Sequence, residues 1–171
     1  FSDALKVGRA CDKANYLWYE DPFKDGGLSQ FAQGKLRELL QTPILMGEHI
    51  RTLEPKVDMV VAGATDYMRV NPAYDMGITG AMKAAHAAEG FGLDVEIHAA
   101  GPAQRHVMAA VRNANYYELA LVHPIAPSSP PPIYIDYQDT LDAIDGNGHV
   151  PVPDGPGLGV TIDEVFLGKH L

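Results

Sequence analysis

The chain alternates between short runs of apolar residues and longer segments in which apolar residues recur every three or four positions. The short runs predict buried β-strands, and the longer segments predict amphipathic helices. Helices are expected at residues 1–14, 28–41, 52–62, 79–88 and 103–112, and strands at residues 16–19, 44–48, 66–70, 93–97 and 116–122. Such alternation is typical of parallel strands covered by helices, so the predicted fold class is α/β.

The first predicted strand shows how these strands end. Its aromatic run, residues 16–19, favours a pleated backbone and is followed by Glu20, Asp21 and Pro22. Pro22 cannot continue a ladder, and it is expected to keep Asp21 extended. The strand should therefore present carboxylates at its C-terminal tip, the end at which α/β proteins carry out their chemistry.

Polar residues recur at or near the ends of all five predicted strands. They are Glu20, Glu48, Asn71, His98 and Glu118, separated by 28, 23, 27 and 20 residues, or close to one βα unit each. In an open sheet only strand ends near the switch point converge, whereas in a closed (β/α)8 TIM-type barrel all of them face one mouth. The pattern therefore favours a barrel.

Five strands do not close an eight-stranded barrel, which usually needs about 250 residues. We therefore expect residues 1–123 to be the C-terminal part of the barrel of a larger enzyme, with further residues preceding Phe1. A half-barrel that pairs with another chain is the alternative. Residues 124–171 read as a separate Pro/Gly-rich tail, because residues 124–132 hold five prolines. A short helix is predicted at residues 163–168 of this tail.

The composition limits the classes of partner that the chain is expected to bind. The chain is 46% hydrophobic and 20% charged, as in ordinary soluble domains, and its net charge of −9 argues against nucleic-acid or membrane surfaces. A single cysteine, Cys11, excludes an internal disulfide and fits a reducing cytoplasm. No uncharged run approaches membrane-spanning length, and no glycine-rich nucleotide motif follows a strand.

The residue types at the strand ends predict metal-assisted acid–base chemistry. Glu20 and Glu48 offer the oxygen ligands that Mg²⁺ prefers, although a third ligand is expected. Asp21 should point away from Glu20, because side chains alternate along a strand. His98 can serve as a general acid or base, and a protonated Glu118 can hydrogen-bond a substrate oxygen. A polar lining without a shared task is the alternative interpretation.

Six motifs resemble, in order and spacing, those of the enolase superfamily, in particular the acid-sugar dehydratases of its mandelate racemase-like branch. They are W-Y-E-D-P at 18–22, M-G-E at 46–48, G-I-T-G at 77–80, I-H-A-A at 97–100, Y-Y-E at 116–118 and P-D-G-P-G-L-G at 153–159. The resemblance runs over nearly the whole chain and implies a capping domain followed by a modified TIM barrel. The present chain would then hold about strands 4–8, with the first strands and the capping domain upstream and the tail packing towards that domain.

The resemblance also implies roles for individual residues. Glu20 and Glu48 match the Mg²⁺ ligands of the fourth and fifth strands, whereas the third-strand acid and the second-strand lysine would lie upstream of Phe1. His98 matches the catalytic histidine of the seventh strand. Glu118 matches the eighth-strand acid that hydrogen-bonds the substrate carboxylate.

One position departs from the family pattern. Asn71 stands where many members have an aspartate that pairs with the histidine. An amide can orient His98 but cannot stabilise an imidazolium as a carboxylate would, so His98 is better suited to donating a proton. Asp75 is a candidate substitute from the following loop. A different base, or a binding role alone for His98, is the alternative.

The resulting hypothesis is a cytoplasmic Mg²⁺-dependent lyase of carbohydrate catabolism. It would remove the proton α to the carboxylate of an acid sugar, stabilise the enediolate with the metal and expel the β-hydroxyl. A racemase, epimerase or cycloisomerase on the same scaffold is the first alternative, and a noncatalytic half-barrel that binds a partner chain is the second. The full-length chain is expected to form a homo-oligomer.

Two further expectations concern residues around this site. His49 follows Glu48 into a loop and is predicted either to contact a polyol substrate or to be solvated. Arg69 and Glu96 each lie two residues before a predicted site residue, and so face the barrel interior. They are expected to form a buried ion pair, because neither charge could remain there alone.

Overall fold

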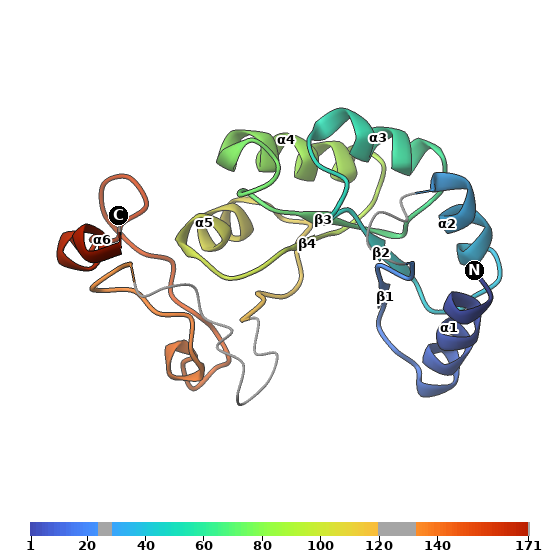
Figure 1. The fold of residues 1–171 in the computed structure, drawn as a ribbon, viewed down its shortest axis with the longest axis horizontal. Helices are drawn as coiled ribbons and strands as arrows, with labels where there is room; N and C mark the ends of the chain where they lie inside the picture. The colour runs from blue at the N-terminus through green and yellow to red at the C-terminus, as the bar shows by residue number, and fades with distance from the viewer. Residues whose placement is uncertain (24–28, 120–132, 171) are drawn as a thin grey trace.

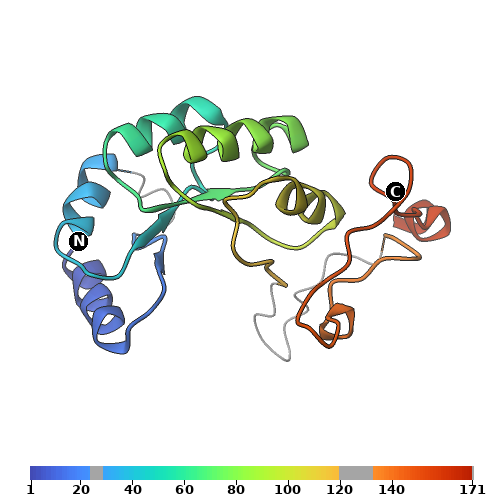
Figure 2. The same ribbon diagram turned by 180° about the vertical axis from the view of Figure 1, so that it is seen from behind.

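The computed structural model describes residues 1–23, 29–119 and 133–170. Four parallel strands form one sheet in the order β1 (Tyr19–Glu20), β2 (Ile44–Met46), β3 (Tyr67–Val70) and β4 (Val95–Ile97). The helices are α1 (Ser2–Ala14), α2 (Gln30–Arg37), α3 (Leu53–Val61), α4 (Gly77–Gly90) and α5 (Pro102–Ala110). They follow the outer side of the curved sheet (Figures 1 and 2). Because each strand pairs with its neighbour in sequence, the sheet has the topology of part of a barrel wall.

The core lies between this sheet and the helices, chiefly α3 to α5, with Ala4 of α1 and Leu36 of α2 also buried in it. The strands contribute long apolar side chains, and α4 contributes alanines whose small size lets the helix approach the sheet. The fully buried members include Met46, Met68, Val70, Val95 and Ile97 from the strands and Met59, Ala81, Ala84, Ala85, Ala88 and Val107 from the helices. This packing fixes the strand ends on which the site is built.

The first strand begins later than the sequence pattern predicts. Asn15 has left-handed backbone angles, φ 54° and ψ 49°, and ends α1 there. The chain then runs outside the sheet, with Tyr16 and Leu17 exposed. Trp18 packs between Tyr67 and Tyr116, with ring centroids 5.9 and 6.1 Å away. The prediction of strand structure at residues 16–18 is therefore wrong, because the chain lies outside the ladder there, with Tyr16 and Leu17 exposed and only Trp18 packed against other rings.

The predicted strand at residues 116–122 is also wrong in its described part. Among the described residues, parallel pairing beyond β4 is confined to a single bridge between Val95 and Ala114. The backbone N–H of Tyr116 donates to the carboxylate of Glu96, at 3.3 Å, where a ladder would need a backbone partner. Residues 120–122 lie outside the described residues.

The described part of the tail contains little regular structure. It has the 3₁₀ helix η1 (Leu141–Ala143) and the helix α6 (Glu164–His170). The latter agrees with the predicted short helix, and Asp163 Oδ1 accepts the N–H of Phe166 at 2.8 Å at its start. The proline-rich residues 124–132 lie outside the described residues. Within the described ranges, no helix is both long enough and apolar enough to cross a membrane.

Candidate active site

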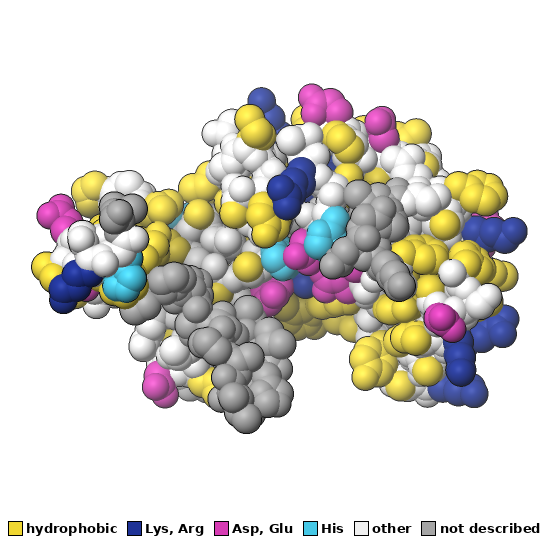
Figure 3. All heavy atoms as spheres, viewed as in Figure 1, with side chains coloured by type: hydrophobic (Ala, Val, Ile, Leu, Met, Phe, Trp, Pro, Cys, Tyr) yellow, Lys and Arg dark blue, Asp and Glu magenta, His cyan; other side chains and the backbone are white. Residues whose placement is uncertain are grey.

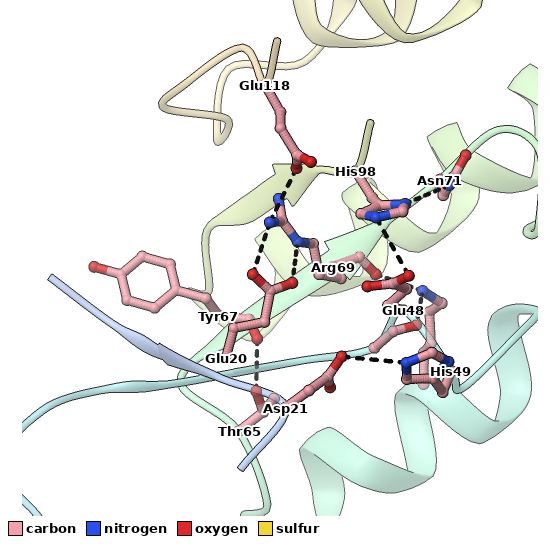
Figure 4. Close-up of polar contacts among 12 residues, drawn as sticks. Glu20, Asp21, Glu48, His49, Thr65, Tyr67, Arg69, Asn71, His98 and Glu118 are labelled. Carbon is pink, nitrogen blue, oxygen red and sulfur yellow. Dashed lines mark hydrogen bonds and ion pairs between the residues drawn. The ribbon is translucent and has the colours of Figure 1, made fainter. Parts of the chain in front are cut away.

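The carboxyl ends of the parallel strands, with the segments that follow them, carry the candidate site. Glu20 ends β1, Glu48 follows β2, Asn71 follows β3 and His98 follows β4. Figure 4 shows these side chains and Glu118 turned toward one another. In the space-filling view, acidic and histidine side chains gather near the middle of the molecule (Figure 3). The structure thus brings together the five residues that the strand-end pattern singled out.

Arg69, from β3, joins two of the predicted acids. Its Nε and Nη2 donate to Glu20 Oε1 and Oε2 at 2.5 and 2.8 Å, and Nη2 lies 3.0 Å from Glu118 Oε2. Burial lowers the pKa of Arg69, but the hydrogen bonds to Glu20 and the charges of Glu20 and Glu118 outweigh it, so the pKa is raised. The guanidinium therefore stays charged and holds two carboxylates from separate segments.

The predicted Arg69–Glu96 ion pair is wrong. Although the two residues are partners across β3 and β4, the long Arg69 side chain extends to Glu20 and Glu118 instead. Glu96 accepts a hydrogen bond from Asn115 Nδ2 at 2.9 Å and another from the backbone N–H of Tyr116. Burial raises the pKa of Glu96 despite these two donors. Its role is to hold the segment that leads to Glu118.

Asn71 fixes the tautomer of His98. The amide oxygen of Asn71 accepts the backbone N–H of Ala73 at 2.9 Å, which turns the Asn71 Nδ2 group toward His98 Nδ1, 2.7 Å away. Nδ1 must then act as the acceptor, so in the neutral ring the proton resides on Nε2. Nε2 lies 3.3 Å from Glu48 Oε1. The His98 N–H therefore faces the carboxylates at the mouth.

Asp75 does not take the place of the missing aspartate. Its carboxylate is buried and accepts the backbone N–H groups of Thr52 and Asn71 at 3.1 and 2.8 Å. The Lys56 ammonium lies 3.1 Å from Asp75 Oδ2. The prediction of Asp75 as a substitute partner for His98 is therefore wrong, because its carboxylate faces the buried side of its loop.

Asp21 is a site residue that the sequence pattern missed. Its φ of 42° is left-handed, so the expectation of an extended Asp21 is wrong. Ligand atoms of Asp21, Glu48 and His49 all lie within 4.8 Å of one another. Burial, together with the charges of Glu20 and Glu48, raises the pKa of Asp21 to about 6, against the opposing effects of His49 and Arg69. Strand alternation could not reveal this turn, since it presupposes regular backbone angles.

The donor set suits a hard divalent cation. Glu20, Asp21 and Glu48 bring carboxylate oxygens to two neighbouring strand ends, and His49 adds an imidazole nitrogen at the rim. Oxygen ligands of this kind are the ones that Mg²⁺ and Ca²⁺ prefer. Both carboxylate oxygens of Glu20 accept hydrogen bonds from Arg69. Ligand atoms of Asp21 and Glu48, by contrast, lie within 4.8 Å of each other, close enough to share a cation.

Comparison with known proteins identifies the family. The model of the "Enolase C-terminal domain-like" family matches residues 1–165. The chain belongs to the enolase C-terminal domain-like family. This result confirms both the resemblance read from the six motifs and the assignment of the curved parallel sheet to a portion of a (β/α)8 barrel.

Members of this enolase-like family similar to the chain include sugar-acid dehydratases. The D-gluconate/D-galactonate dehydratase of Picrophilus torridus is 30% identical over 97% of the chain and 41% of the relative. The arabinonate dehydratase of Saccharolobus solfataricus is 30% identical over 97% of the chain and 43% of the relative. A crystal structure of D-glucarate dehydratase from Agrobacterium tumefaciens complexed with magnesium matches with a TM-score of 0.80 and 30% identity, over 98% of the chain and 43% of that protein. The chain thus spans less than half the length of each.

Proposed function

We propose that the chain is the barrel portion of a Mg²⁺-dependent sugar-acid dehydratase. The observation that carries the proposal is the convergence of Glu20, Glu48 and His98 from the ends of β1, β2 and β4, with Glu118 beside them. The dehydratases among its relatives, one of them crystallised with magnesium, support it.

Glu20 and Glu48 are the proposed metal ligands, with Asp21 as a third carboxylate within reach of Glu48. When bound, Mg²⁺ would supply positive charge to offset the charge that develops on the substrate carboxylate as its α proton leaves. Arg69 holds Glu20 in place at the mouth before any cation arrives. The carboxylate oxygens of this donor set fit such an ion.

His98 is the proposed general acid. Its Nε2–H faces the mouth, and Asn71 holds Nδ1 as an acceptor. In the neutral tautomer Nε2–H can hydrogen-bond the β-hydroxyl. Proton transfer to that group requires the imidazolium, which gives its Nε2 proton to the departing water and returns to the neutral ring. Asn71 acts by keeping the ring in this tautomer, as a hydrogen-bonded partner does for many catalytic histidines.

Glu118 and His49 are the proposed substrate-binding residues. Glu118 Oε2 is buried and is paired with Arg69 without hydrogen-bond geometry, so it retains capacity for a further partner. While paired with Arg69, the Glu118 carboxylate can accept hydrogen bonds from substrate hydroxyl groups, and only after protonation could it donate one to a substrate carboxylate oxygen. The partly exposed His49 side chain lies at the rim, where a polyol chain would pass.

The test is product analysis with the intact enzyme, using D-gluconate, D-galactonate, arabinonate and D-glucarate with Mg²⁺. A dehydratase forms a 2-keto-3-deoxy acid, and both excess chelator and Glu48→Gln should abolish its formation. The exposed Glu54→Gln on α3 is the matched control and should retain activity. Full activity in excess chelator would overturn the metal-dependent mechanism.

Running the same assay in deuterated water distinguishes the isomerase alternative. A racemase or epimerase returns an isomer of the substrate that carries deuterium at the α carbon, with no loss of water. The dehydratase returns the keto acid instead. Formation of the labelled epimer alone would refute dehydration and support isomerisation. The proposed site residues would be unaffected by that result.

A further inference from the structure

Lys56 is a buried charged residue to which the proposed reaction assigns no role. It lies on α3, and its side chain keeps only 1% of its surface exposed, as does that of Asp75. Lysine is almost never fully buried without partners, since removing its charge from water is costly. Burial lowers the pKa of Lys56, and the charge and hydrogen bond of Asp75 oppose that change. The contacts of Lys56 and Asp75 must therefore offset the large free-energy cost of removing both charges from water.

The Lys56 ammonium bridges the ends of two neighbouring strands. Its Nζ donates to the carbonyl oxygen of Gly47 at 2.9 Å and to the carbonyl oxygen of Arg69, and pairs with Asp75 Oδ2. Gly47 follows β2 directly, and Arg69 lies in β3. One side chain thus supplies the donors that tie the end of β2 to β3.

Asp75 completes the connection from the other side. Its Oδ1 accepts the N–H of Thr52, in the loop after β2, and its Oδ2 accepts the N–H of Asn71, after β3. Thr52 has a left-handed φ of 69°, which a β-branched residue adopts only when its surroundings hold it. Together the two side chains join the β2–α3 loop to the β3–α4 loop.

The proposed catalytic residues are adjacent to the two loops that Lys56 and Asp75 join. Glu48 follows Gly47 in the chain, and Asn71 carries the hydrogen bond to His98. The backbones approach so closely that a Cβ at Gly47 would lie 2.8 Å from the Arg69 carbonyl oxygen and 3.3 Å from Lys56 Nζ. Small shifts in this layer would change the separation of Glu48 and His98, which is 3.3 Å between Oε1 and Nε2.

We propose that Lys56 and Asp75 form a positioning pair that sets the Glu48 carboxylate against the Asn71–His98 couple. The proposal rests on the proposed function, since it assigns the pair's purpose to that site. Neither residue touches the reacting groups at the mouth through its side chain. The pair acts through the backbone at Gly47 and Asn71, much as outer hydrogen-bond partners orient metal ligands and catalytic histidines.

The experiment compares Lys56→Met, Asp75→Asn and the double variant in the intact enzyme, with the exposed Lys83→Met of α4 as control. Each single variant leaves one buried charge alone and should lower the thermal midpoint strongly. The double variant leaves neither charge alone and should regain part of this loss. Its Mg²⁺ affinity, measured by calorimetry, and its kcat should nevertheless remain about 10- to 100-fold below wild type, because the strand-end contacts are still missing.

A merely structural pair predicts the opposite outcome for the double variant. If its Mg²⁺ affinity and kcat recovered to the level of Lys83→Met, the positioning role would be refuted. If the double variant does not fold, Lys56→Gln replaces it, since its shorter, uncharged side chain cannot bridge the Gly47 and Arg69 carbonyl oxygens as Lys56 Nζ does. Wild-type Mg²⁺ affinity and kcat in Lys56→Gln would refute the proposal equally.

A readout independent of catalysis separates this proposal from the proposed function. The side-chain amide protons of Asn71, observed by NMR in the metal-free enzyme, report the hydrogen bond to His98. We expect their signals to move toward those of a free amide in the double variant and to stay unchanged in Lys83→Met. Unchanged Asn71 signals would count against the positioning pair, whereas a wild-type enzyme that binds no Mg²⁺ would count against the proposed function.

Discussion

At the scale of single residues, one backbone angle changes which side chains meet at the mouth. Asp21 has a φ of 42°, and its carboxylate joins Glu48 and His49. Positive φ is uncommon outside glycine, so a strand pattern followed by proline gives no reason to expect it. The burial of this carboxylate among other acids raises its pKa to about 6. In the absence of a cation, the ionised Asp21 therefore destabilises the folded chain.

Asp21→Asn should raise thermal stability in metal-free buffer at pH 7.5. The folded state holds the Asp21 proton up to about pH 6, whereas an ordinary carboxyl releases it near 3.8. The stability that Asp21 contributes is therefore complete below pH 3.8 and lost as the pH rises through 6. The variant should gain about 1–2 kcal/mol at pH 7.5. Unfolding midpoints measured from pH 7.5 down to pH 4 check this.

The gain should shrink as the pH falls, because wild-type Asp21 then becomes protonated as well. The control is Asp58→Asn, which removes an exposed carboxylate on α3. A gain that stays constant across this range would contradict the raised pKa of Asp21.

The sequence predicted which residues reach the mouth better than it predicted their partners. Glu20, Glu48, Asn71 and His98 follow from spacing, because one βα unit separates successive strand ends. The partner of Arg69 could not be predicted in this way. Arg69 and Glu96 share a face, but the guanidinium extends past Glu96 to Glu20 and Glu118, which lie 49 residues before and 49 residues after it in the sequence. Side-chain length and direction decide that choice, and neither appears in a periodicity.

At the scale of elements, the start of α4 explains the G-I-T-G motif. Gly80 packs so closely on the preceding loop that a Cβ there would lie 1.6 Å from the carbonyl oxygen of Asp75. Gly77 begins the helix with a left-handed φ of 75°. The motif therefore lets α4 fold back against the loop that carries Asp75. The sequence marked this turn, but the reason for its second glycine is visible only in the packing.

Gly80→Ala should destabilise the chain by about 1–3 kcal/mol, because the new Cβ meets rigid backbone. The matched control is Gly90→Ala at the other end of α4, where a Cβ would meet nothing within 4 Å. Alanine favours a helix over glycine by up to about 1 kcal/mol, so the control should be neutral or stabilising. Thermal unfolding of both variants checks the contrast, and equal effects at the two positions would contradict the close approach at Gly80.

At the scale of the whole molecule, the sequence predicted the alternation of strands and helices but not how the tail is attached. Arg105 of α5 donates to the carbonyl oxygens of Gln138 and Pro151, and its Nη2 lies 2.6 Å from Asp139 Oδ1. Tyr117 also donates to Asp139 Oδ1 at 2.6 Å. These partners are 22 to 46 residues apart in the chain and follow no period. The cluster joins the tail to the segment that carries Glu118.

Asp139→Asn should therefore loosen the tail from the barrel. Both side chains of the Arg105–Asp139 pair keep only 3% of their surface exposed, so the variant leaves the Arg105 charge buried without its counter-ion. Loss of one partner from a buried pair costs about 3–5 kcal/mol. We expect faster amide hydrogen exchange at residues 133–163, measured by mass spectrometry, with little change in β2 and β3.

Glu89→Gln is the control: its partner Arg112 is 85% exposed, and exposed pairs contribute little. Tail exchange as slow as in this control would show that the pair does not hold the tail, whereas faster exchange together with weaker substrate binding would connect the tail to the position of Glu118.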